Sequence, residues 1–92
     1  MSTLSAKEIA SHLQLRPHWK IEGGELVRHF KFETFRDAIS FVDKVADLAE
    51  EAGHHPDIDI RYNRVRLALI SHDAGGLTGK DFAIAAGADE LA

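Results

Sequence analysis

The sequence predicts an α+β fold: a four-stranded antiparallel sheet with helices packed on one face, in the order α-ββ-α-ββ-α. Two pairs of short alternating segments are each joined by turn residues, and amphipathic segments with capping residues flank them. No glycine-rich nucleotide loop follows a strand, so a parallel βαβ unit is not indicated. A small sheet needs helices over one face to build a core. With 92 residues, the chain is expected to form a single domain over 1–92.

The first predicted helix starts at a capping box. Ser5 is followed three residues later by Glu8, and this spacing lets each side chain bond the backbone N–H of the other residue. Ile9 and Leu13 are four residues apart and therefore share one helix face. Pro17 cannot continue the helix. We expect a helix of roughly ten residues that ends shortly before Pro17.

The segments on both sides of Gly23-Gly24 predict a β-hairpin. Trp19 and Ile21 alternate with polar residues over 18–22, which indicates a first strand. The glycine pair permits the backbone conformations of a tight turn. The longer segment 25–33 also alternates and is the expected second strand. Its two faces carry Leu26, Arg28, Phe30 and Phe32 on one side, and Val27, His29 and Lys31 on the other.

The strongest helix signal lies between Thr34 and Gly53. Thr34 is a suitable N-cap, and Asp37 lies in the first turn, where an acidic charge is favourable. Gly53 supplies a C-terminal stop, and Pro56 prevents continuation. The apolar positions repeat with helical spacing: they are Phe35, Ala38, Ile39, Val42, Val45, Ala46 and Ala49.

A second hairpin and a last helix complete the predicted order. Apolar residues alternate with charged ones over 57–62, and Asn63-Arg64 can turn the chain into a partner strand over 65–72. We expect both hairpins to share one antiparallel sheet. Thr78 is a suitable N-cap for the final helix, with Asp81 at the third helical position. This helix carries the apolar residues Phe82, Ile84, Ala85 and Leu91.

The composition argues against several functional classes. Lysine and arginine number 11 and aspartate and glutamate 15, which gives a net charge of -4. General attraction to nucleic acid or anionic membranes is therefore not expected. The absence of cysteine excludes disulfides and cysteine-ligated zinc. Residues 1–8 lack the apolar segment of a secretion signal, and no apolar run of about 18 residues is present. We expect a cytoplasmic protein without a membrane or direct nucleic-acid partner.

Three of the six histidines fall where predicted elements end. His54 and His55 lie in the link after the middle helix, where Pro56 restricts the backbone before it. His72 ends the last predicted strand, and Asp81 lies one turn into the final helix. Imidazole exchanges protons near neutral pH, so it can act as a proton donor or a proton acceptor. These residues are therefore candidates for acid-base catalysis.

The candidates also have plainer interpretations. A His-His-Pro segment alone is more often a solvated loop, Asp81 can be only a helix first-turn charge, and Glu50 a solvated helix edge. Three histidines and a carboxylate can bind zinc, although the spacing matches no standard zinc motif. Three further histidines are interpreted as surface or strand-face residues: His12, His18 and His29. Most phenylalanines are expected in the core: Phe30, Phe32, Phe35 and Phe41.

Taken together, three segments resemble the pterin-4a-carbinolamine dehydratase family. They are Glu50-Glu51-Ala52-Gly53-His54-His55-Pro56, then Tyr62-Asn63-Arg64-Val65, then Ser71-His72-Asp73-Ala74-Gly75-Gly76-Leu77-Thr78 with Asp81. Their order and spacing are far more specific than His-His-Pro alone. The likeness extends upstream to Trp19, to the Phe30-Lys31-Phe32 strand and to the helix over 35–50. The resemblance therefore covers nearly the whole chain.

The resemblance implies a pterin pocket on the predicted fold. The implied reaction removes water from 4a-hydroxytetrahydropterin, the product of an aromatic amino acid hydroxylase, and gives quinonoid dihydropterin. It implies no metal and no organic cofactor. The family forms homodimers and homotetramers, and the open edges of a four-stranded sheet also favour association.

The same resemblance implies two sets of site residues. The catalytic set is His54, His55, His72 and Asp81. The substrate-binding set is Glu50, His54, His55, Pro56, Ser71, His72, Asp73, Ala74 and Lys80. Ser71 replaces a more frequent threonine and keeps its hydroxyl. Gly53 and Ile58 replace an acidic residue and a tryptophan of animal members, which bears on the preference for the pterin side chain.

Animal members of the family also have a second role, as dimerisation cofactors of a homeodomain transcription factor. A protein-interaction module that acts as a dimerisation cofactor or coactivator is therefore the alternative function. The complete histidine set favours catalysis.

Overall fold

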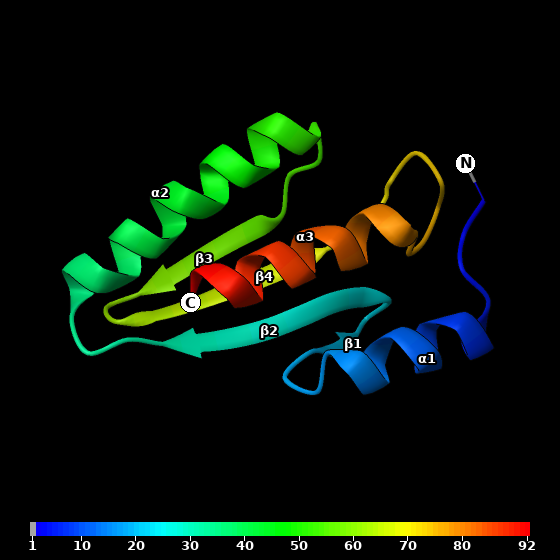
Figure 1. The fold of residues 1–92 in the computed structure, drawn as a ribbon, viewed down its shortest axis with the longest axis horizontal. Helices are drawn as coiled ribbons and strands as arrows, with labels where there is room; N and C mark the ends of the chain where they lie inside the picture. The colour runs from blue at the N-terminus through cyan, green and yellow to red at the C-terminus, as the bar shows by residue number, and fades with distance from the viewer. Residues whose placement is uncertain (1) are drawn as a thin grey trace.

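Helices and hairpins alternate along the chain in the predicted order, and the α+β class is confirmed. The computed structural model describes residues 2–92. Its elements are α1 (Ala6–Leu15), β1 (Lys20–Glu22), β2 (Glu25–Lys31), α2 (Phe35–Ala52), β3 (Asp57–Arg61), β4 (Arg64–Leu69) and α3 (Gly79–Leu91), shown in Figure 1.

The two hairpins join through their long strands into one antiparallel sheet. The strand order is β1-β2-β4-β3, so β2 and β4 are central and β1 and β3 are the edges. Asp57, at the start of β3, lies opposite Ala68, near the end of β4. The link before β3 and the loop after β4 therefore leave the sheet at the same end. This topology brings residues 54–56 and 70–72 into one region.

The core lies between one face of the sheet and the helical layer (Figure 1). Helix α2 buries the stripe Ala38, Phe41, Val45 and Ala49, which repeats every three or four residues. The largest fully buried side chains of the core are Leu26, Leu67, Leu69 and Ile84. Replacing one of these leucines with alanine is expected to cost about 2–5 kcal/mol.

The first hairpin is shorter than predicted at both outer ends. Strand β1 begins at Lys20 and not at residue 18, because Trp19 N–H donates to Arg16 O at 3.0 Å and so belongs to a turn. Strand β2 ends at Lys31 and not at residue 33. Its partner β4 starts opposite Lys31, and Phe32 beyond it bonds a turn residue, with Phe32 N–H donating to Asn63 O at 2.9 Å.

The second hairpin turns one residue earlier than predicted. Arg61 pairs with Arg64, so Tyr62 and Asn63 form the turn, in place of Asn63 and Arg64. Tyr62 takes a positive φ of 55°, the left-handed conformation that this reversal requires. Its side chain is 70% exposed and does not continue the alternation of β3.

The last strand also ends earlier than predicted, at Leu69 and not at His72. Ser71 instead forms an isolated antiparallel bridge with Gly76, and its N–H donates to Gly76 O at 3.1 Å. The segment between them is thereby folded back as a compact loop. His72 belongs to this loop.

Two aromatic side chains differ from the prediction. Phe35 is 48% exposed because it is the first residue of α2 and lies on the flank of its buried face. Phe30 and Phe41 are buried as predicted. His12 is partly buried and stacks on Phe82, with 4.5 Å between the ring centroids, so it is more than a surface residue.

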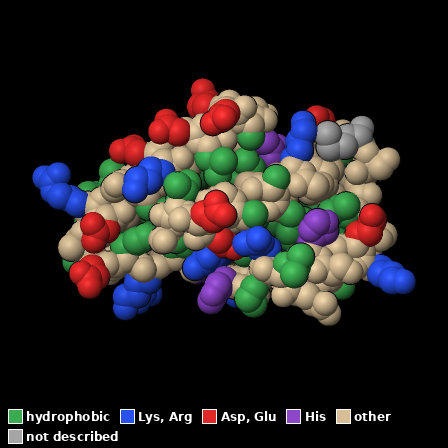
Figure 2. Space-filling model, in the orientation of Figure 1, with side chains coloured by type: hydrophobic (Ala, Val, Ile, Leu, Met, Phe, Trp, Pro, Cys, Tyr) green, Lys and Arg blue, Asp and Glu red, His purple; other side chains and the backbone are tan. Residues whose placement is uncertain are grey.

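The outward face of α2 is acidic. Asp43, Asp47, Glu50 and Glu51 are exposed, and Figure 2 shows acidic side chains along this helix. Helix α2 is therefore amphipathic, as predicted. Within residues 2–92, no helix has both the length and the apolar character needed to cross a membrane.

Candidate functional site

The end of α2 determines where His54 lies. Gly53 terminates the helix with a φ of 64°, a left-handed conformation that glycine adopts without a steric penalty. His54 N–H then donates to Ala49 O at 3.1 Å, which ties the histidine to the last helical turn. The imidazole is only 13% exposed. The backbone therefore holds His54 in place before β3 begins.

Asp81, in the first turn of α3, has polar partners on both carboxylate oxygens. Its Oδ2 accepts from Ser71 Oγ at 2.8 Å and from Thr78 N–H at 2.9 Å. Its Oδ1 lies 2.6 Å from Nε2 of His54. The Asp81 side chain is fully buried, and a buried carboxylate is stable only with such partners. The arrangement fixes the carboxylate and the imidazole together.

Thr78 has a larger role in this cluster than the capping role predicted for it. Its hydroxyl does cap α3, and it forms a capping box with Asp81. The same hydroxyl oxygen lies 2.8 Å from Ser71 Oγ, and both residues are buried. The Thr-x-x-Asp spacing was the available sequence signal. The contact with Ser71 depends on the fold of the loop between them and has no local signal.

His55 lies in a different environment from its neighbour. Its Nε2 contacts Oε2 of Glu50, and the two side chains are 60% and 76% exposed. Exposed ion pairs contribute little to stability because water and salt screen them. His55 is therefore accessible from solvent beside the buried pair of His54 and Asp81.

His72 and Asp73 are exposed in the loop after β4. Their loop is tied back by Gly75 N–H, which donates to Ser71 O at 3.0 Å. The His72 imidazole takes no part in the hydrogen bonds around Asp81. Topology therefore brings His72 to the same end of the sheet as the other candidates, and its catalytic role stays a prediction.

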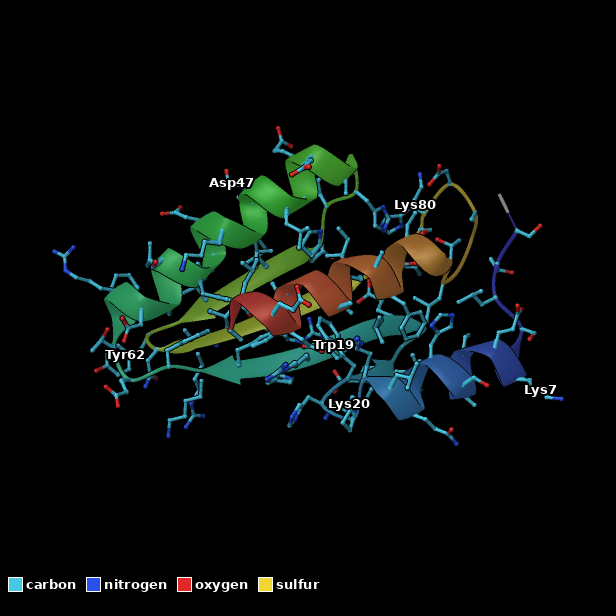
Figure 3. The ribbon with its side chains drawn as sticks, viewed as in Figure 1. Lys7, Trp19, Lys20, Asp47, Tyr62 and Lys80 are labelled. Atoms are coloured by element: carbon cyan, nitrogen blue, oxygen red, sulfur yellow. The ribbon has the colours of Figure 1, made fainter. Side chains whose placement is uncertain are left out.

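The remaining candidates surround this end of the sheet. Pro56 and Ala74 are partly buried in the two connecting segments. Lys80 is exposed in the first turn of α3. Figure 3 shows Lys80 and Tyr62 at opposite ends of the molecule. Lys80 thus places a positive charge at the end of the sheet that carries the histidines.

Two surface hollows lie away from these residues. One, of about 400 Å³, is lined by Phe35, Arg36, Ile39, Ser40 and Asp43 on α2. Another, of about 330 Å³, is lined by Lys7, Glu8, Ser11, His12 and Leu15 on α1. Within residues 2–92, no three histidine, aspartate or glutamate side chains are grouped as metal ligands would be.

The α+β scaffold thus places a fully buried carboxylate against one imidazole, with a second imidazole exposed beside it, and groups of this kind are able to transfer protons. The sequence comparisons identify the family. The profile of Pterin 4 alpha carbinolamine dehydratase matches residues 2–91. A Chloroflexus aurantiacus protein named "Putative pterin-4-alpha-carbinolamine dehydratase" is 64% identical over 91 residues, covering 99% of this chain and 98% of that protein. The chain belongs to the pterin-4a-carbinolamine dehydratase family, as the resemblance predicted.

Two solved structures share the fold. A Brucella melitensis protein described as a transcriptional coactivator/pterin dehydratase superposes with a TM-score of 0.95 at 31% identity, over 99% of both chains. A pterin dehydratase-like protein described as a RuBisCO assembly factor in the alpha-carboxysome superposes with a TM-score of 0.65 at 28% identity, over 79% of this chain and 84% of that one. The same fold thus occurs in a protein described as a coactivator and dehydratase and in one described as an assembly factor.

Proposed function

We propose that this chain is a cytoplasmic dehydratase, a hydro-lyase acting on 4a-hydroxytetrahydropterin. In this role it recycles the pterin cofactor of an aromatic amino acid hydroxylase. Family membership supports the substrate class. The observation that carries the proposal is the buried 2.6 Å contact between His54 Nε2 and Asp81 Oδ1. A carboxylate so placed orients the imidazole and stabilises the imidazolium that forms when it accepts a proton.

The proposed reaction is an elimination with two proton transfers. The C4a–O bond breaks, the hydroxyl leaves with an added proton as water, and the pterin ring loses a proton as the quinonoid double bonds form. One group must supply the first proton and another must accept the second. We assign these transfers to His54, His55 and His72, with Asp81 holding His54. The scheme requires neither a metal nor an organic cofactor.

The substrate is proposed to lie over the end of the sheet that carries these histidines. The binding residues that we assign are Glu50, Pro56, Ser71, Asp73, Ala74 and Lys80, together with the three histidines. Asp73 and Lys80 are exposed and can therefore reach a ligand. Ser71 differs from them because its hydroxyl already bonds Asp81 and Thr78. Its contribution to binding is therefore indirect.

A second function, as an interaction module, is favoured by the descriptions of the two structural relatives as a coactivator and as an assembly factor. In this chain the hollow on α2 exposes Phe35, an aromatic side chain of the type found at interfaces. Substitution of Phe35 with serine is expected to leave turnover unchanged if the two functions use separate surfaces. Turnover of 4a-hydroxytetrahydropterin by the parent protein would support the dehydratase, and its absence would favour the interaction module.

We further propose that the chain forms a homodimer or homotetramer through its β3 edge. Every residue of β3 is exposed, and Ile58 and Ile60 remain 38% and 37% exposed. An open strand edge with exposed apolar side chains favours pairing with a second copy. Ile60→Lys is expected to lower the mass measured by light scattering. Leu15→Lys, at a residue of α1 that is 73% exposed, is the matched control. Equal masses for both variants would remove β3 from the interface.

The direct test is stopped-flow turnover of chemically generated 4a-hydroxytetrahydropterin. This compound also dehydrates spontaneously, so the uncatalysed rate is subtracted at each condition. The corrected rate is expected to rise in proportion to protein concentration. A folded protein that adds nothing to the uncatalysed rate would contradict the dehydratase proposal and favour the interaction module.

A metal-dependent hydrolase is the remaining alternative. Because the proposed chemistry needs only proton transfers, full activity is expected to survive exhaustive chelation. The measurement compares turnover before and after chelation, with zinc added back in a third sample. Activity lost on chelation and restored by stoichiometric zinc would contradict the proposal.

A further inference from the structure

The hydrogen atoms around Asp81 can be placed by counting donors. Ser71 has a single hydroxyl proton, and it is donated to Asp81 Oδ2 at 2.8 Å. The 2.8 Å contact between Ser71 Oγ and Thr78 Oγ1 must therefore use the proton of Thr78. Thr78 N–H also donates to Oδ2, at 2.9 Å. Every proton of this chain of hydrogen bonds thus points toward Asp81.

This count makes Oδ2 of Asp81 the acceptor of two hydrogen bonds. Its Oδ2 already faces two donors, so a proton on the carboxyl group would have room only on Oδ1. With the carboxylate ionised, the 2.6 Å contact between Oδ1 and His54 Nε2 is a hydrogen bond only if Nε2 carries the hydrogen. The other ring nitrogen, Nδ1, is then the atom that can change its protonation.

We propose that Ser71 and Thr78 are positioning residues that keep the negative charge on Asp81. His54 consequently always holds a proton on Nε2 and exchanges protons with the substrate through Nδ1. The identity of that substrate rests on the proposed function. The protonation pattern is a property of the folded chain and can be measured without substrate.

Burial is what gives the two hydroxyls this effect. Asp81 is 0% exposed, Thr78 1% and Ser71 3%, so water cannot readily replace a lost donor. In such surroundings a hydrogen-bonded chain is stronger, and a missing donor is costly. Without Ser71 or Thr78, the proton between Oδ1 and Nε2 is expected to move toward Asp81 whenever Nδ1 is also protonated.

The first test is ¹⁵N NMR of the histidine rings in the full chain, with the His54 signals assigned by their loss in His54→Gln. In the parent, Nε2 is expected to remain protonated across the titration while Nδ1 changes. In Asp81→Asn, the amide oxygen accepts from Ser71 and Thr78, so the NH₂ group faces Nε2. The neutral ring is then expected to carry its proton on Nδ1, and turnover to fall by about 10²–10⁴-fold.

The second test removes the two hydroxyls one at a time. In Ser71→Ala and Thr78→Val at acidic pH, the Nε2 signal of His54 is expected to shift partly toward an unprotonated nitrogen. Thr78→Ser keeps the hydroxyl and should restore the parent signal. Thr34→Val is the matched control, because Thr34 caps α2 through the same side chain but lies outside the cluster. It should lower stability without altering the His54 signals.

The outcomes separate this proposal from the dehydratase function. A parent protein with its neutral His54 protonated on Nδ1 would overturn the proposal, and so would equal spectra for the parent, Ser71→Ala and Thr78→Val. Should Thr78→Val fail to fold, Ser71→Ala carries the same test. Protonation of Nε2 without any turnover would instead contradict the dehydratase function and leave the proposal standing.

Discussion

Helices α1 and α3 begin with the same capping device in different surroundings. At α1, Ser5 and Glu8 exchange hydrogen bonds of 2.8 and 3.1 Å, and both residues are exposed. At α3, Thr78 and Asp81 exchange the equivalent bonds, and both are buried. Asp81 alone also contacts an imidazole, that of His54. The carboxylate of a capping box can therefore also hold a titratable side chain when both groups are buried together.

Solvent explains why the two boxes differ. The carboxylate of Glu8 can exchange its partners for water at little cost, so its bonds act only on the start of α1. The carboxylate of Asp81 cannot exchange its partners for water in this way, because an unpaired buried charge costs several kcal/mol or more. Its donors and His54 must therefore remain in place. Burial thus makes the capping box of α3 rigid, and the same burial keeps the Asp81 carboxylate against His54.

The largest expected effect is the loss of turnover when the imidazole partner of the buried box is removed. His54→Ala is expected to reduce the dehydration rate by about 10²-fold or more, because a positioned acid or base contributes that much. His12→Ala is the control, since His12 is also partly buried and stacks on Phe82. Equal losses in the two variants, measured by stopped flow on folded protein, would mean that His54 has no special role.

The next effect is on stability and compares the two caps directly. Thr78→Ala removes a buried cap and a donor to Ser71, which is expected to cost about 2–3 kcal/mol. Ser5→Ala removes an exposed cap and is expected to cost about 1 kcal/mol or less. Urea denaturation measures both. Similar costs would show that burial adds nothing to the α3 cap.

How far the sequence predicted the fold can be seen at the element ends. The N-caps Ser5, Thr34 and Thr78 begin their helices where predicted, because capping is chemistry between residues three positions apart. The strand ends were less predictable. Strand β1 starts at Lys20 and β4 ends at Leu69 because of hydrogen bonds to residues outside the strands. Those hydrogen-bond partners depend on how the neighbouring segments fold. The alternation of apolar and polar residues gives no information about them.

The sequence predicted which region of the fold carries the site, but not the individual contacts within it. The order of elements was enough to expect His54 and Asp81 at one end of the sheet, where the structure brings them within 2.6 Å. The hydroxyl contact between Ser71 and Thr78 was not predictable, since it depends on the bridge that closes the loop after β4. His72 is exposed in the loop after β4, and its catalytic role stays a prediction.

A smaller effect is the dependence of turnover on pH. The competent enzyme needs one protonated and one unprotonated group, so the corrected rate is expected to form a bell with limbs that change about tenfold per pH unit. The limbs of such a bell describe the site as a whole and are not assigned to single residues. Glu8→Gln should leave the profile unchanged, whereas Asp81→Asn should alter its shape. A flat profile over about pH 5–9 in the parent would remove histidine catalysis.

The smallest effect concerns the exposed box, whose acid dependence follows from the pKa of Glu8. The backbone N–H and the hydroxyl of Ser5 hold this pKa below its ordinary value. A lowered folded-state pKa adds stability that is present above the unfolded-state pKa and is lost as pH falls through the folded-state one. Glu8→Gln should therefore lower Tm slightly at pH 7, and the difference from the parent should vanish on acidification through the folded-state pKa of Glu8. In a Ser5→Ala background the same substitution should still lower Tm at pH 7, but by less, because the backbone N–H of residue 5 can still donate to the Glu8 carboxylate while the hydroxyl is lost. A Tm difference that persists unchanged at low pH would mean that Glu8 acts on α1 by something other than its charge.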